Sequence, residues 1–390
     1  MLSLTSNTTG CLNTAVGLKS LYLNTTACNN TAIGACSLYS NTTGTGNTAL
    51  GRSAMAASTC GDGNLAAGFG AMANNTTGCY NVATGYEALV NNTTGESSAA
   101  VGYKALYTQT TGGKNTAVGC RSLYSSTTGL CNVAIGGEAM YYNTTGCLNT
   151  AIGMAALQAN TTANQNTAVG SCSLVTNCTG TQNTGVGANV MGDNTTGSCN
   201  VAVGRAALYR NTTGGFNVAI GRSALYCNTT ASSNVAIGSE AMERTTTGNS
   251  NVAIGKNAAC LNTTGSDSVA IGPDALLRNT TGYSNVAIAK DSMQCNTTGC
   301  LNTAVGFKSL VLNSTGLYNT AIGSCALYNT TGSYSTGDGY EALKANTTGR
   351  NTVIGFKSMN ANTTGTQNTA SGMYSLCKNT TGCQNTASGY

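Results

Sequence analysis

The sequence predicts an all-β fold, an elongated β-solenoid of the β-roll type with about 23 coils of seventeen residues. Two observations predict it. A Gly closes an Asn-Thr-Ala-Val-Gly or Asn-Val-Ala-Ile-Gly block every seventeen residues, as at Gly17, Gly34 and Gly51. A Leu or Met follows four residues after most of these glycines. So regular a period over a whole chain is the signature of a repeat architecture.

The Gly column keeps its step of seventeen from Gly17 to Gly323, and Ala289 is its one replacement. Two later steps are one residue shorter, and the first missing residue is predicted to fall before Asn329, in a turn that tolerates deletion. We expect residues 1–390 to form one continuous repeat array without separate caps.

The residues before each Gly have the pattern of a short strand. One residue before the Gly is nearly always Val or Ile and three before it is mostly Thr or Val, as in Val133-Ala134-Ile135. Such β-branched side chains two residues apart face the same way in a strand. The Ala between them, with the Gly, makes a face of small residues. We expect another chain to pack closely on this Ala/Gly face.

The Leu/Met column is the predicted core. Each repeat supplies one large apolar side chain, which a single repeat could not bury but a stack can. About six residues separate the Gly from the following Asn-Thr-Thr-Gly, too few for a secure helix, so a short strand or one helical turn is expected. The core column includes Leu21, Leu38, Leu106, Leu123, Leu157 and Leu208.

The Asn-Thr-Thr-Gly element is predicted to be a solvent-facing corner, because Asn and Gly tolerate left-handed backbone conformations. A coil would then consist of two short extended segments and two turns. If each coil adds one strand spacing of about 4.8 Å, the array forms a rod about 110 Å long.

Composition excludes several classes of function. Only 7% of residues are charged, against roughly 25% in an average protein. The net charge of +5 is dilute, and no run of Lys or Arg could follow a phosphate backbone, so we expect no nucleic-acid partner. No apolar stretch reaches about twenty residues, so no membrane span is expected. The chain has no His and no Cys-x-x-Cys pair, so we expect neither metal nor cofactor.

The block Asn-Val-Ala-Ile-Gly-x-x-Ala, as in residues 132–139, resembles the head repeat of YadA-like trimeric autotransporter adhesins, which also occurs in phage and virus fibres. The resemblance covers essentially every repeat, although each match is short. It implies a left-handed β-roll, association of three parallel chains, and Val-x-Ile side chains that fill the coil interior. The period here is a few residues longer than usual in that family because of the Asn-Thr-Thr-Gly corner.

An Asn-x-Ser/Thr sequon recurs at this corner in most coils. It predicts a column of N-linked glycans if the corner is exposed in a secreted protein. The alternative is that Asn and Thr serve turn geometry and hydrogen-bond ladders between coils. The candidate glycosylation sites are Asn24, Asn41, Asn75, Asn92, Asn143, Asn160, Asn194, Asn211, Asn228, Asn262, Asn279 and Asn296.

Other columns have weaker functional signals. Cys11 and Cys28 occupy the same position in adjacent coils, within the reach of a disulfide. A second Asn column, which precedes the strand, is predicted to satisfy backbone groups. The column two after the Gly mixes charges, as Lys104 and Glu87 do, which indicates a solvated face and no catalytic carboxylate pair. A recurring Tyr predicts packing between chains, with binding of sugar rings as the alternative.

These observations favour a structural surface fibre or filament, extracellular or on a virion, acting as a shaft or adhesin and not as an enzyme. Its expected partners are further copies, as a trimer, an end-to-end filament or both, and surface glycans or a host receptor. The alternative is an ice-binding β-solenoid with Thr and Asn arrays. Against it, the adjacent Thr residues of Asn-Thr-Thr would point to opposite faces of a strand.

Overall fold

The computed structural model describes residues 2–390, which contain no helix and one three-residue strand per coil. The predicted class is confirmed, since the fold is an all-β solenoid built from coils of about seventeen residues. The chain divides into two compact units, residues 2–196 and 197–390.

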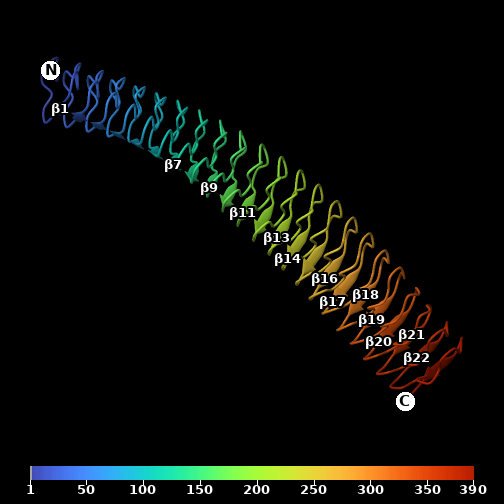
Figure 1. Cartoon of the computed structure of the whole chain (residues 1–390). Helices are drawn as coiled ribbons and strands as arrows, with labels where there is room; N and C mark the ends of the chain where they lie inside the picture. Colours follow the sequence, from blue (N-terminus) through green and yellow to red (C-terminus); the bar gives the residue numbers. More distant parts are fainter. Residues whose placement is uncertain (1) are drawn as a thin grey trace. The chain divides into compact units, whose positions relative to one another are not determined.

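The first unit is a stack of eleven strands, drawn from blue to green in Figure 1. Each strand pairs in parallel with the next one, offset by one repeat, so that Thr14 lies opposite Thr31 and Ala134 opposite Ala151. The strands are β1 Thr14–Val16, β2 Thr31–Ile33, β3 Thr48–Leu50, β4 Leu65–Ala67, β5 Val82–Thr84, β6 Ala99–Val101, β7 Thr116–Val118, β8 Val133–Ile135, β9 Thr150–Ile152, β10 Thr167–Val169 and β11 Thr184–Val186.

The second unit is built in the same way from twelve strands. The shorter steps lie at β20, where Thr336 pairs with both Thr320 and Thr352. The strands are β12 Val201–Val203, β13 Val218–Ile220, β14 Val235–Ile237, β15 Val252–Ile254, β16 Val269–Ile271, β17 Val286–Ile288, β18 Thr303–Val305, β19 Thr320–Ile322, β20 Thr336–Asp338, β21 Thr352–Ile354, β22 Thr369–Ser371 and β23 Thr386–Ser388.

Backbone hydrogen bonds join neighbouring coils well beyond the strands. In the coil that contains β8, the N–H of Gly136 donates to the preceding coil at 2.8 Å, and so does that of Glu138 at 2.9 Å. The N–H groups of Met140 and Thr144 donate to the following coil, at 2.9 and 2.8 Å. Because buried backbone polar groups need partners, each coil depends on both of its neighbours.

The turns of each coil rest on left-handed backbone conformations. The Gly column has φ between 117° and 144°, and a Cβ added to Gly119 would lie 2.6 Å from the carbonyl oxygen of Gly136. Three non-Gly columns also have positive φ, as at Glu138 (58°), Met140 (51°) and Leu148 (59°). Such a conformation costs an L-residue roughly 1–2 kcal/mol, so contacts between coils must offset it.

The core lies between the strand and the Leu/Met column. All six residues named from sequence are fully buried, at 0% exposure: Leu21, Leu38, Leu106, Leu123, Leu157 and Leu208. The central residue of the strand faces them. Gly185 takes the Ala position in β11, and a Cβ added there would lie 3.3 Å from Met191 Cε. In most coils the interior therefore has room for little more than a methyl group opposite the Leu or Met.

This narrow interior reverses the expected roles of the two strand faces. The implied filling of the coil by Val-x-Ile side chains is wrong, because Ile135 is 39% exposed while Ala134 is fully buried. The expected use of the Ala/Gly face by another chain is also wrong for the coils inside the array. Their Ala methyl groups, including that of Ala253, pack within their own coils. The bulkier β-branched side chains lie on the outside, except Val353 of β21, which is buried in the Ala position opposite Gly337 of β20.

The structure also places the first missing residue at a different point of the turn from the one predicted. Asn329 was expected to keep the place of the sequon Asn, with the missing residue before it. Instead Thr330 is fully buried in that place and its N–H donates to the carbonyl of Leu327 at 3.1 Å, as Asn313 does to Leu310. The missing residue therefore falls after Thr330, because the buried ladder position must stay filled.

Candidate functional site

The sequon column lies in the interior of the coil and not at its surface. The exposed fraction is 0% for eleven candidates and 2% for Asn262. The prediction that this Asn faces solvent is wrong. The twelve buried residues are Asn24, Asn41, Asn75, Asn92, Asn143, Asn160, Asn194, Asn211, Asn228, Asn262, Asn279 and Asn296.

These side chains form an amide ladder along the stack, which was the alternative interpretation. Asn160 Nδ2 donates to Asn143 Oδ1 in the preceding coil at 2.8 Å and to the carbonyl of Ala163 at 3.2 Å. An N-linked glycan is attached at this nitrogen, so it would break the ladder and enter a filled interior. The folded coil is therefore incompatible with glycosylation at these positions.

The second Asn column forms a parallel ladder, as predicted. The backbone N–H of Asn149 donates to Asn132 Oδ1 at 3.0 Å, and Asn149 Nδ2 donates to the Ala163 carbonyl at 2.8 Å. The same carbonyl accepts the bond from Asn160, so the two ladders meet at one acceptor in this coil. The Asn residues thus have a structural role in closing the corner.

The first Thr of the corner is also engaged. Thr144 Oγ1 donates to the Thr161 carbonyl of the next coil at 3.0 Å, and the same bond recurs along both units. This hydroxyl column is not free to order water or a ligand through its proton. The Asn and first Thr columns of the corner are therefore occupied by bonds between coils, whereas the second Thr, as at Thr145, is exposed.

Cys11 and Cys28 lie side by side as free thiols, with their Sγ atoms 2.7 Å apart. Their hydrogen bond raises the pKa of Cys11 and lowers the pKa of Cys28. By contrast, burial raises the pKa of Cys260 to about 12, with a further contribution from Glu243. Cys11 and Cys28 have the geometry for oxidation to a disulfide, whereas Cys260 has the environment of an inert thiol.

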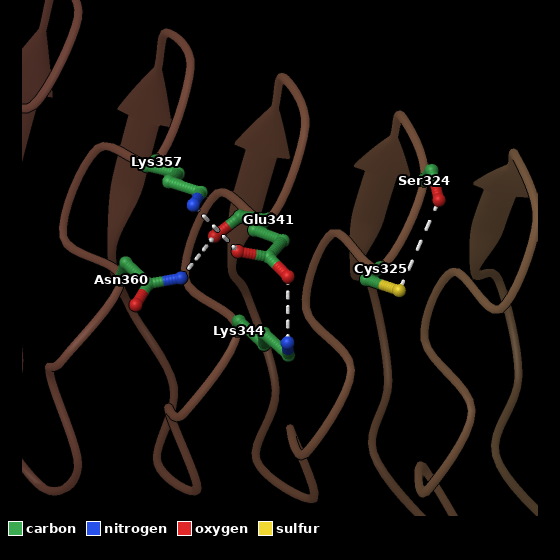
Figure 2. Close-up of polar contacts among 6 residues, drawn as sticks. All are labelled: Ser324, Cys325, Glu341, Lys344, Lys357 and Asn360. Carbon is green, nitrogen blue, oxygen red and sulfur yellow. Dashed lines mark hydrogen bonds and ion pairs between the residues drawn. The ribbon is translucent and has the colours of Figure 1, made fainter.

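Several charged side chains two after the Gly pair with opposite charges on neighbouring coils. Lys104 Nζ lies 3.4 Å from Glu87 Oε2. Figure 2 shows Glu341 between Lys344 of its own coil, at 2.6 Å, and Lys357 of the next, at 3.6 Å. The hydrogen bond from Lys344 is the main cause that holds the pKa of Glu341 below its usual range. These contacts have the character of surface ion pairs.

Within residues 2–390, no group of three or more His, Cys, Asp or Glu side chains is arranged to hold a metal ion. One surface hollow is lined by Glu96, Lys114 and Cys131, and a second by Tyr334 and Arg350. Neither lining set combines a nucleophile with a base held by a third group, which is the arrangement of covalent catalysis.

Aromatic side chains stack along the array at the position predicted from sequence. Tyr107, Tyr124 and Tyr141 follow one another with ring centroids 5.0 Å apart and planes within 3° of parallel. Tyr209 and Tyr226 form a similar pair in the second unit, at 5.3 Å. Their ring faces contact one another, so the stripe presents mainly edges outward.

The remaining regular surface is the strand face, defined here as the outward side chains one and three residues before each Gly. These residues are half-buried or exposed in every strand, with Ile220 at 38% and Ile254 at 37%. In the second unit their β-branched side chains repeat in register, as from β13 to β15. Sequence reasoning found these columns but assigned them to the interior.

No helix in the described part of the chain could cross a membrane. In comparisons with known proteins, no protein-family model and no curated protein matches this chain.

Proposed function

We propose that this chain is a structural element of a fibre or filament, extracellular or on a virion surface, and not an enzyme. One observation carries the proposal: both Asn ladders, the Thr bonds and most backbone bonds of a coil run to its neighbours along the stack. Tension along the array would therefore be shared by many parallel hydrogen bonds at every step. Such a construction suits a shaft.

Self-association is part of the proposal, as a trimer, an end-to-end filament or both. The resemblance to surface adhesin repeats supports it, and so does the exposed apolar strand face. Surface glycans or a host receptor are the ligands that we propose for an adhesin-like role. The neutral surface, with 7% charged residues, favours contacts through amides and hydroxyls over electrostatic attraction.

Small-angle scattering and negative-stain microscopy of the purified chain test the fibre role. A rod with the cross-section of a single coil or of a few laterally packed coils is the expected particle. A compact globular particle with no long axis would overturn the proposal.

Ice binding is the second candidate, and one observation favours it. In the first unit, Thr150, Thr167 and Thr184 project outward in register from β9 to β11. These residues are two apart from Val or Ile, so the earlier objection about adjacent Thr residues does not apply to the strand face. Thermal hysteresis of ice growth measures this function. Absence of hysteresis at millimolar protein would remove this candidate.

A further inference from the structure

The strand face of the second unit is an apolar strip over eight consecutive strands. From β12 to β19 the first residue of each strand is Val or Thr and the third is Val or Ile, and both columns are in register throughout. Ile220, Ile237 and Ile254 each leave 36–38% of their surface exposed. We call these sixteen outward side chains the Val/Ile strip.

The strip contains no charged side chain, although charged residues lie close to it in the sequence. The chain has 17 Lys and Arg and 12 Asp and Glu, and among residues 2–390 Asp338 is the only one of them in a strand. Asp338 lies in β20, just beyond the end of the strip. In the same coils, Arg222, Glu240 and Lys256 follow the Gly by one or two residues. Solvent alone gives no reason to keep charges from an outward strand face.

The regular repeat of the strip indicates its partner. Its side chains recur once per strand spacing, about 4.8 Å, so a surface that matches every step must have the same axial repeat. A second copy of this chain has that repeat and is equally free of charge. Two such sheets can pack face to face about 10 Å apart, with their side chains interdigitated.

The area agrees with an interface between copies. Eight strands span about 38 Å, and two columns with their flanks are about 10 Å wide, so the strip offers roughly 400 Å² per copy. The eleven strands of the first unit offer roughly 500 Å² in the same way. A standard interface buries about 800 Å² per partner, so each of these faces by itself supplies half of that area or slightly more, the size of a weak contact between copies.

We infer that two copies of this chain pack face to face through the Val/Ile strip of the second unit. The inference rests on the proposed fibre function and specifies the surface for its lateral association. It replaces the Ala/Gly face, which is buried within the coils, by the β-branched face on the outside.

The test uses the full chain and two double variants with the same added charge. Ile237→Lys with Ile254→Lys places two charges in the strip. Ser233→Lys with Ser250→Lys places them in the same two coils, in an exposed column that carries Lys114 elsewhere. Sedimentation velocity at micromolar concentration measures association, and circular dichroism measures folding. We expect the strip variant to associate at least tenfold more weakly, while the Ser variant matches the parent chain and all three keep the same melting midpoint.

The outcomes separate the inference from the fibre function. If both variants associate as the parent does, the strip is not the contact, although the fibre proposal stands. A parent chain that stays monomeric but rod-shaped overturns the inference and leaves the fibre role to end-to-end assembly. A monomeric parent chain that shows thermal hysteresis overturns it in favour of ice binding. A trimer that the strip variant dissolves keeps the strip as the contact but overturns the two-copy arrangement.

Discussion

Replacement of Leu157 by Ala tests whether one core residue holds several coils. Leu157 is fully buried, between Met140 and Leu174 of the adjacent coils in the same column. The change removes three carbons, worth about 2.4 kcal/mol of transfer free energy at about 0.8 kcal/mol per carbon. The cavity adds to this cost, because the hydrogen bond from Leu157 N to Ser173 O, at 3.0 Å, holds the coil spacing. We expect a local loss of about 3–5 kcal/mol.

Hydrogen exchange followed by mass spectrometry is the suitable assay, since a long repeat array need not unfold in one step. Faster exchange should be confined to the coil of Leu157 and a few coils on either side. Ile152→Ala is the matched control, because it removes the same number of carbons from a side chain that is 39% exposed, so it should cost only about 1.5 kcal/mol and leave no closed cavity. Equal effects of the two changes, or an effect spread evenly over the chain, would refute the reasoning about the core.

Three further predictions concern the turn, the ion pairs and the thiols. Gly119→Ala should lower the thermal midpoint of the chain, because φ is 134° and the new Cβ would meet a carbonyl oxygen at 2.6 Å; an unchanged midpoint would contradict it. The depressed pKa of Glu341 contributes stability that is present above the unfolded-state pKa and is lost as the pH falls through the folded one. Lys344→Met should raise the pKa of Glu341 toward its ordinary range, as a carboxyl NMR titration would show, and an unmoved titration would rule out the pair as its cause. Mild oxidation with a disulfide reagent should join Cys11 to Cys28 with loss of two hydrogens in peptide mass mapping, and Cys28→Ser should abolish that peptide.

Much of the fold could be predicted because its signals are periodic. The Gly column, the strand before it and the buried Leu/Met column all recur at one step, and Leu106 and Leu123 lie where that step places them. Repetition made each position visible many times. A single coil, with three strand residues and several turns, would have given no secure assignment.

The candidate sites were harder to predict, because the same short motif occurs both at exposed surfaces and in buried positions. Asn-Thr-Thr is both a glycosylation sequon and the sequence of an internal amide ladder, and residues such as Asn143 carry no local mark that separates the two. The difference depends on whether the corner turns its Asn inward. That is decided by acceptors in the neighbouring coil, such as the Oδ1 of Asn143 that receives Asn160.

The sequence alone determined the coil length, the parallel register and the identity of the core column, since these follow from residue types repeated at a constant interval. Only the tertiary structure decided which strand face is inside. The alternation of side chains in a strand defines two faces but does not say which one is buried. The buried face is selected by the width of the interior beside the Leu/Met column. That width admits the methyl group of Ala134 and excludes Ile135. The left-handed conformation of Met140 is decided in the same way, because only hydrogen bonds and packing between coils can offset its cost.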